Sequence, residues 1–202
     1  ALGYNLVISH HPLIFKGYKS ITGKDYVERC IMKAIKNDLV IYAAHTNLDN
    51  APGGVNFKIA EKIGLKNVRI LEVKENAMQQ AGAGVIGELE VPETELEFLK
   101  RIKKTFEAGC LKHNKLTGRE IQTVALCGGA GAFLMPIAIR NRADVFITGE
   151  IKYHDYFGHD TDILLAEIGH YESEQYTKEI FYTIIRELSL IHISEPTRLL
   201  SI

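Results

Sequence analysis

Apolar runs of strand length alternate with stretches of helical periodicity along most of this chain. The first run covers Asn5–Ser9, a helical pattern begins at about Asp25, and the second run covers Leu39–Ala44. Strand, helix and strand in succession is the pattern of a βαβ unit, whose two strands run parallel. The sequence therefore predicts an α/β fold with largely parallel sheets.

The same alternation resumes after the polar stretch KENAMQQ at 74–80. Further strand-like runs follow at 84–90, 122–126, 144–147 and 162–168, and a last amphipathic helix is expected to end near Glu187. We expect two α/β portions, at 1–73 and 74–187. KENAMQQ is short for a flexible linker and is equally compatible with a simple loop.

Both ends of the chain suggest a fragment. The first residue is Ala1 rather than a methionine, and it lies within a strand-like pattern. At the other end, LSLIHISEPTR at 188–198 resembles the in-frame translation of a common sequencing adapter. We therefore regard 188–202 as a non-native tail and assign no function to it.

Composition excludes several classes of function. The chain has 24 lysines and arginines against 25 aspartates and glutamates, a net charge of -1, and no basic run of the kind that binds nucleic acid. No apolar stretch reaches the roughly 18 residues of a membrane-spanning helix. The 3 cysteines have no CxxC spacing and predict neither a disulfide framework nor a thiolate zinc site. We expect a cytoplasmic protein without a nucleic-acid or membrane partner.

Histidines stand where predicted strands end. The sequences ISHHP, AAHTNLD, GEIKYH and IGHYESE place five of them there: His10, His11, His45, His154 and His170. Parallel strands end at one edge of a sheet, and open α/β folds bind ligands at that carboxyl edge. Separate segments of the chain would thus bring imidazoles to one place.

Two carboxylates accompany these imidazoles at the same spacing. Asp49 lies four residues after His45, in the polar stretch TNLDNAPGG at 46–54 that we expect to be a loop, and Glu174 lies four residues after His170. Imidazole nitrogen with carboxylate oxygen suits zinc, iron, manganese or nickel, and the absence of cysteine argues against a closed structural zinc site. The sequence predicts an open metal site of the catalytic type.

His10 and His11 are adjacent and precede Pro12. Successive side chains of a regular strand point to opposite faces, so two adjacent histidines would be poor ligands for one ion. One solution is two metal ions, each bound by one histidine, with a carboxylate between them. The alternative is one buried and one exposed histidine without any metal.

Two glycine-rich stretches need interpretation. GAGVIG at 82–87 has the GxGxxG spelling but leads into a strand, so it predicts no dinucleotide site. CGGAGAF at 127–133 follows a strand and precedes a helix, where the amides of Gly128, Gly129 and Gly131 could hold a phosphate. A tight turn without a ligand is the alternative, and the more common explanation of such a stretch.

The chain resembles a known family through five segments taken in order: ISHHPLIFKGYKSITG, YAAHTNLDNAPGGVN, ALCGGAGAF, FITGEIKYHDY and GHYESEQ. They are similar to the dinuclear metal centre proteins called GTP cyclohydrolase 1 type 2 homologs, or NGG-one-interacting factor three-like proteins, over about residues 1–187. The resemblance implies two similar α/β portions packed around a shared metal site. It also implies a toroidal homohexamer and two divalent ions per subunit, of zinc, iron, manganese or nickel. It implies the ligands His10, His11, Asp49, His170 and Glu174.

Other roles follow from the same resemblance. His45 would be a ligand or a close neighbour of one, and Glu150 and His154 would hydrogen-bond to water or substrate. Three departures are expected: the family segment before HHP is absent, the closing strand is replaced by the tail, and no ferredoxin-like domain is inserted between the two portions. The chain would thus be a short form of the family.

The resemblance implies a metal-dependent hydrolase. In a GTP cyclohydrolase reaction, hydroxide attacks C8 of the purine and formate is released, and His154 would shuttle a proton. Two alternatives remain open from the residues. One is a non-catalytic metal-binding scaffold or regulator, and the other is a nucleotide phosphoesterase that would hold its phosphate with CGGAGAF.

Overall fold

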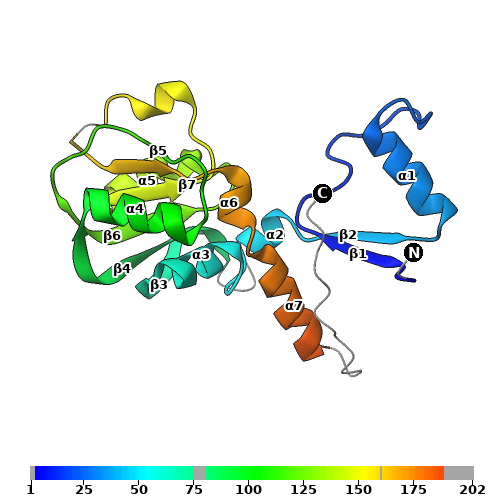
Figure 1. Cartoon of the computed structure of the whole chain (residues 1–202), viewed down its shortest axis with the longest axis horizontal. Helices are drawn as coiled ribbons and strands as arrows, with labels where there is room; N and C mark the ends of the chain where they lie inside the picture. The colour runs from blue at the N-terminus through cyan, green and yellow to red at the C-terminus, as the bar shows by residue number, and fades with distance from the viewer. Residues whose placement is uncertain (1–2, 75–80, 160, 189–202) are drawn as a thin grey trace. The chain divides into compact units, whose positions relative to one another are not determined.

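The computed structural model describes residues 3–74, 81–159 and 161–188 (Figure 1). It divides into two compact units, Ala1–Asp49 and Asn50–Ile202. This division falls earlier than the boundary expected at 73/74, because the strands on either side of KENAMQQ are hydrogen-bonded neighbours in one sheet. The proposed non-native tail, apart from Leu188, lies outside the described residues.

The first unit is a βαβ crossover followed by one helical turn (Figure 1). β1 (Leu6–Ser9) and β2 (Val40–Ala43) pair in parallel, and α1 (Tyr26–Lys36) connects them. α2 (Thr46–Asp49) follows β2 directly. The predicted parallel pairing is confirmed here, and it brings the carboxyl ends of both strands to one edge.

A buried carboxylate anchors the start of α1. Asp25 caps the helix by accepting a hydrogen bond of 2.8 Å from the amide of Glu28. The Glu28 carboxylate accepts hydrogen bonds from the amides of Thr22, Gly23 and Lys24 and from the Thr22 hydroxyl. Burial alone would raise the pKa of Glu28, but these hydrogen bonds outweigh it and lower the pKa to about 2. An ionised carboxylate therefore ties the preceding loop to α1.

The first unit has a small apolar core. Among its described residues, the buried apolar side chains are Ile31, Ala44 and Leu48. Several large apolar side chains of β1 and β2 are instead exposed: Leu6, Val7, Val40, Ile41 and Tyr42. Burial of apolar area is the main stabilising contribution to a fold, so this unit is weakly stabilised by its own packing.

In the described part of the second unit, six strands form one sheet in the order β3-β4-β6-β7-β8-β5. They are β3 (Lys66–Val73), β4 (Gly82–Thr94), β5 (Lys112–His113), β6 (Glu120–Cys127), β7 (Val145–Thr148) and β8 (Leu164–Glu167). β6, β7 and β8 run parallel, while β4 pairs antiparallel with β3 and β6, and β5 with β8. The predicted α/β class and the parallel centre are confirmed, with antiparallel strands on either side of it.

Helices cover both faces of this sheet. The helical elements are α3 (Val55–Ile63), α4 (Glu95–Thr105), η1 (Ala132–Leu134), α5 (Met135–Arg140), η2 (Tyr153–Tyr156), α6 (His170–Glu174) and α7 (Thr177–Leu188). α3 and α4 lie against β4 and β6. Met135 and Ala138 of α5 join Phe146 of β7 in one apolar cluster. Every residue of β7 is buried, as expected for a strand covered on both faces.

Four local features bear on the predicted elements. The last helix is divided into α6 and α7, and GAGVIG lies within β4 as predicted. β5 was not predicted, because its two residues are too few for a periodic pattern. A Cβ at Gly87 would lie 2.9 Å from the Lys66 carbonyl oxygen, so this glycine permits a close approach of β3 and β4.

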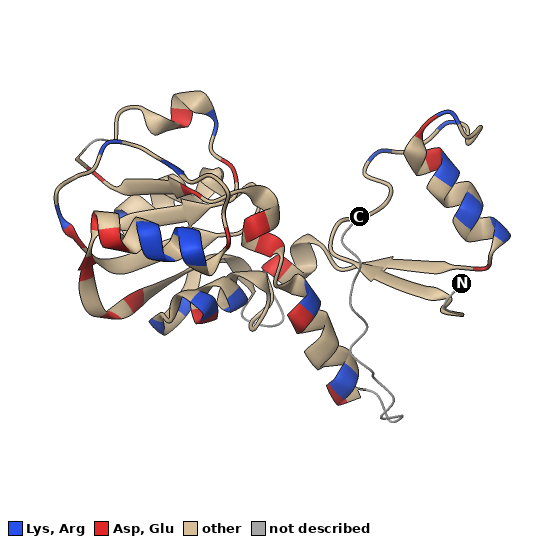
Figure 2. Cartoon of the chain, in the orientation of Figure 1, with Lys and Arg blue, Asp and Glu red and all other residues tan. Residues whose placement is uncertain are grey.

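Acidic and basic side chains are interspersed over both units (Figure 2). On the second unit, Glu179 of α7 forms ion pairs with Lys58 at 3.2 Å and Lys62 at 3.0 Å, which join α7 to α3. No described helix combines the length and apolar character needed to cross a membrane.

Candidate metal centre

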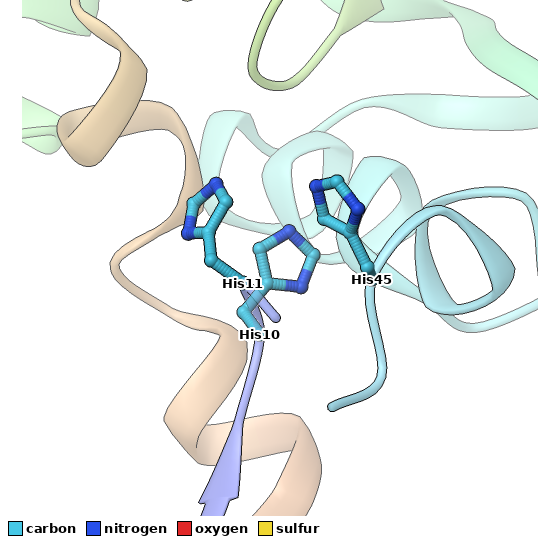
Figure 3. A group of neighbouring side chains, drawn as sticks. All are labelled: His10, His11 and His45. Atoms are coloured by element: carbon cyan, nitrogen blue, oxygen red, sulfur yellow. The ribbon is translucent and has the colours of Figure 1, made fainter. Parts of the chain in front are cut away.

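Three histidines gather at the carboxyl ends of β1 and β2 (Figure 3). His10 and His11 directly follow Ser9, which pairs with Ala43 at the end of β2, and His45 lies two residues beyond Ala43. The ring centroids are 4.9 Å apart for His10 and His11, 5.3 Å for His10 and His45, and 5.2 Å for His11 and His45. One nitrogen from each ring lies within 4.8 Å of the other two.

This spacing is close to what one ion requires. Zinc binds imidazole nitrogen at about 2.0–2.1 Å, so two nitrogens on one ion are at most about 4.2 Å apart. Small side-chain rotations would therefore bring the nitrogens of His10, His11 and His45 from within 4.8 Å to ligating distance. His45 thus lies beside His10 and His11, and its role as a ligand or a close neighbour of the ligands stays a prediction.

Hydrogen bonding orients the His10 ring. Its Nδ1 donates to the carbonyl of Ala44 at 2.9 Å, which leaves Nε2 facing Asp49 Oδ1 at 3.5 Å. The His10 side chain is 8% exposed. A backbone carbonyl on one ring nitrogen holds metal-binding histidines in the tautomer whose other nitrogen is the ligand. Nε2 of His10 is thus the ligand nitrogen that this arrangement presents.

Two local expectations about these residues were wrong. TNLD is not a loop but the helical turn α2, closed by bonds from the Leu48 and Asp49 amides to the His45 carbonyl. His10 and His11 lie beyond the end of β1, so strand alternation does not direct their side chains to opposite faces. The adjacent pair therefore gives no independent reason for two ions.

Phe15 is a neighbour of this cluster that sequence reasoning missed. The centroid of its ring lies 5.5 Å from that of His45 and 6.4 Å from that of His11, and the residue is 66% exposed. It places an apolar ring beside the imidazoles. No periodic pattern marks a residue in an irregular loop, so its proximity was not predictable.

The second unit carries its own imidazole and carboxylates at the carboxyl ends of β7 and β8. His170 begins α6, and its Nε2 lies 3.3 Å from Oε2 of Glu174, four residues later on the same helix. Glu150, just after β7, approaches Nδ1 of His170 at 2.6 Å. The predicted i, i+4 pair is confirmed. A carboxylate on Nδ1 that leaves Nε2 beside another donor is the usual surrounding of a metal-binding histidine.

The amides of the glycine loop after β6 form hydrogen bonds within the second unit. Each of the three amides donates to a side-chain oxygen of the second unit at 2.8–3.0 Å: Gly128 to Asn56, Gly129 to Ser173 and Gly131 to Thr148. Amides committed in this way are not directed at an anion. The loop therefore does not form the predicted phosphate cradle, and the tight-turn alternative describes it better.

Glu150 and His154 were both expected to contact water or substrate. Glu150 bonds to His170, whereas His154 is exposed on η2, where its ring lies 5.2 Å from that of Tyr153. Among the described residues, His154 belongs to none of the groups of clustered metal-type donors. A proton-shuttling role for His154 therefore stays a prediction.

The segment after Glu150 is anchored by Glu167 at the end of β8. Glu167 accepts hydrogen bonds from the amide of Ile151 at 3.3 Å and from the hydroxyl of Tyr156 at 2.5 Å, and pairs with Lys112 at 2.7 Å. Burial alone would raise the pKa of Glu167, but the hydrogen bonds from Lys112 and Tyr156 outweigh it and lower the pKa. An ionised carboxylate thus holds the stretch that presents Glu150.

The donors of each unit fit a divalent metal ion. The first unit offers three imidazoles and Asp49, and the second offers one imidazole with Glu150 and Glu174 nearby. Nitrogen and oxygen donors of this kind suit zinc, iron, manganese and nickel. Among the described residues, these groups include no cysteine, which argues against a closed structural zinc site.

Known proteins resemble this chain in sequence. The chain matches the family model described as Duf34/NIF3 (NGG1p interacting factor 3) over residues 1–196. A Lactococcus lactis protein named GTP cyclohydrolase 1 type 2 homolog is 35% identical over 180 residues, which cover 85% of this chain and 65% of that relative. NIF3-like protein 1 of Drosophila melanogaster is 32% identical over 200 residues, covering 94% and 66%. The chain thus spans about two thirds of the length of these relatives.

Solved structures share the fold. The crystal structure of a Staphylococcus aureus hypothetical protein matches with a TM-score of 0.80 at 28% identity, over 98% of this chain and 81% of that one. A Bacillus cereus protein related to NIF3 matches with a TM-score of 0.81 at 23% identity, over 99% and 82%. Because the family model matches nearly the whole chain and the fold agrees, this chain belongs to the DUF34/NIF3 family.

Proposed function

We propose that this chain binds two divalent metal ions and acts as a metal-dependent hydrolase. The observation that carries the proposal is the cluster of His10, His11 and His45, whose ring nitrogens lie within 4.8 Å of one another. Asp49 adds a carboxylate 3.5 Å from His10. In the proposal, His170 and Glu174 of the second unit supply the remaining ligands, as the family resemblance implies.

The protein groups have distinct roles in this proposal. When bound, two divalent ions would supply Lewis acidity and lower the pKa of water toward about 7. Asp49 and Glu174 balance positive charge, because carboxylates are the only anionic ligands in the set. The Ala44 carbonyl and Glu150 hold the rings of His10 and His170, so that Nε2 of each is the ligand atom.

For the substrate we propose a nucleotide with a purine ring, hydrolysed at C8 as in a GTP cyclohydrolase reaction. The support is the name GTP cyclohydrolase 1 type 2 homolog that the Lactococcus lactis relative carries. A phosphoesterase has less support, because the amides of the glycine loop donate to the protein rather than toward an anion. A homohexamer is part of the proposal, and light scattering of the purified protein tests it.

Turnover of GTP tests the catalytic part of the proposal. The purified chain is loaded with Mn²⁺, Fe²⁺ or Zn²⁺ and incubated with GTP, and formate and pterin fluorescence are measured beside a general phosphodiesterase assay. We expect formate release that depends on metal and is lost in His11→Ala. The matched control is His113→Ala, which removes an exposed histidine of β5.

The outcomes of this assay separate the alternatives. Formate release at equal rates in His11→Ala and in the unchanged chain would contradict the proposed site. Phosphate ester hydrolysis without formate would favour a phosphoesterase. Retained metal without turnover in either assay would favour a metal-binding scaffold or regulator.

A further inference from the structure

Gly129 connects the ends of three strands of the second unit, β6, β7 and β8, by hydrogen bonds. Its amide donates to Ser173 Oγ on α6 at 2.9 Å. Its carbonyl accepts hydrogen bonds from the amide of Gly149 at 2.9 Å, the amide of Glu150 at 3.1 Å and the hydroxyl of Thr148 at 3.1 Å. A single residue at the end of β6 therefore holds the segment after β7 and the helix after β8.

Ser173 extends this connection to the proposed ligand His170. Its hydroxyl accepts the hydrogen bond from Gly129 and donates to the carbonyl of His170 at 2.7 Å. Ser173 is 1% exposed, so water does not compete for these bonds. The backbone of His170 is thereby set by the glycine loop through one buried hydroxyl.

The missing side chain of Gly129 faces the proposed donor atoms. A Cβ at this position would overlap Oε1 of Glu174 and would lie 3.4 Å from Nε2 of His170. The φ of +60° at Gly129 is by itself a reason for glycine. This φ value does not explain why the position that a side chain would take at Gly129 lies against the Glu174 carboxylate.

Gly149 shows the same close approach from the end of β7. A Cβ there would lie 2.7 Å from the carbonyl oxygen of Gly129, 2.8 Å from Ser173 Oγ and 2.9 Å from the Cα of His170. Its backbone geometry is not the left-handed one that favours glycine, so close packing is the reason for glycine at this position. Two glycines thus allow the ends of β6 and β7 to pack directly on α6.

We infer that Gly129 is a positioning residue for the metal ligands His170 and Glu174. The inference rests on the proposed metal-binding function and extends it to a loop that contributes no ligand. A methyl group at Gly129 would force the Glu174 carboxylate to rotate away, because the added carbon would overlap Oε1 of that carboxylate. The glycine loop then serves the orientation of the ligands rather than the binding of a phosphate.

Gly129→Ala, compared with Gly118→Ala, tests this role with Co²⁺ as the probe. Gly118 has a φ of +80°, and a Cβ there would meet nothing within 4 Å, so its alanine variant carries similar backbone strain without the steric conflict. We expect Gly129→Ala to bind Co²⁺ about 10- to 100-fold more weakly, in the range typical of groups that orient metal ligands. Its visible Co²⁺ spectrum should change, and Gly118→Ala should resemble the unchanged chain in both measurements.

Ser173→Ala provides a second, smaller change in case Gly129→Ala does not fold. It removes only the hydroxyl between Gly129 and His170. Thr177→Val removes another buried hydroxyl of the second unit, which donates to the Glu174 carbonyl, and serves as a reference for the loss of stability alone. We expect weaker Co²⁺ binding and an altered spectrum in Ser173→Ala, at a stability loss similar to that of Thr177→Val.

The outcomes distinguish this inference from the function on which it rests. Equal Co²⁺ affinity and equal spectra in Gly129→Ala and Gly118→Ala would overturn the positioning role while leaving the metal centre intact. If Gly129→Ala is unfolded, equal Co²⁺ affinity and equal spectra in Ser173→Ala and the unchanged chain overturn it in the same way. An unchanged chain that binds no Co²⁺ would overturn the metal centre and the positioning role together.

Discussion

The two units hold their candidate ligands in different ways. In the first unit, three histidines follow a two-stranded sheet with largely exposed apolar side chains, and the His10 ring is oriented by the backbone carbonyl of Ala44. In the second unit, His170 and Glu174 lie at the edge of a six-stranded sheet and are tied to it through Ser173 and Gly129. The first unit brings three imidazole nitrogens together, and the second orients one imidazole and one carboxylate.

The two units differ in which groups hold the donor atoms in place. Donors held by side-chain hydrogen bonds depend on residues that contribute no ligand atom, whereas donors held by a backbone carbonyl depend on the fold of the chain. We therefore expect substitutions around the ligands to weaken metal binding mainly in the second unit. Substitutions of buried apolar residues should likewise lower the unfolding free energy more in the second unit than in the first.

The largest expected effect is on stability, from Phe98→Ala in the second unit. Phe98 is 0% exposed, and the loss of such a side chain costs about 3–5 kcal/mol of unfolding free energy. Ile31→Ala should cost less, since few apolar side chains of the first unit are buried. Urea unfolding followed by circular dichroism measures both, and equal losses would contradict the contrast between the two cores.

Glu150→Gln should have the next largest effect, on metal affinity. A neutral amide on Nδ1 makes the His170 ring a weaker ligand, and changes of this kind typically cost about 10- to 100-fold in affinity. Chelator competition measures the change in metal affinity. The control is Glu172→Gln, which changes a carboxylate on the helix that begins at His170. Unchanged affinity in Glu150→Gln would show that the second unit does not depend on its supporting carboxylate.

The smallest expected effect concerns Glu28 of the first unit and appears on acidification. Its pKa is lowered from 4.5 to about 2, so its stabilising contribution is complete above 4.5 and is lost as the pH falls toward 2. The difference in unfolding free energy between the unchanged chain and Glu28→Gln should therefore shrink over that interval. A difference that is independent of pH would contradict the role of an ionised carboxylate at the start of α1.

The sequence was informative where structure is local. Strand ends and helical spacing are short-range patterns, so the positions of His10, His11, His45 and His170 after strands were predictable, as was the i, i+4 pair with Glu174. The parallel β1–β2 pairing followed from the strand, helix, strand rhythm for the same reason.

The features that were missed depend on contacts between distant segments. The amides of the glycine loop meet Asn56, Ser173 and Thr148, from three other parts of the chain, and no local pattern marks those partners. The directions of His10 and His11 depend on bends beyond the last strand residue, where strand alternation no longer applies. The unit boundary after Asp49 reflects the pairing of β3 with β4 across KENAMQQ.

Metal counting in ligand variants tests the central claim most directly. The protein is loaded with Mn²⁺ or Zn²⁺, separated from unbound ions and analysed by mass spectrometry for metal per chain. The proposal predicts two ions per chain in the unchanged protein and in His113→Ala, and fewer than two in His11→Ala and in Glu174→Ala. If His11→Ala and Glu174→Ala both retain two ions per chain, the proposed ligands are wrong.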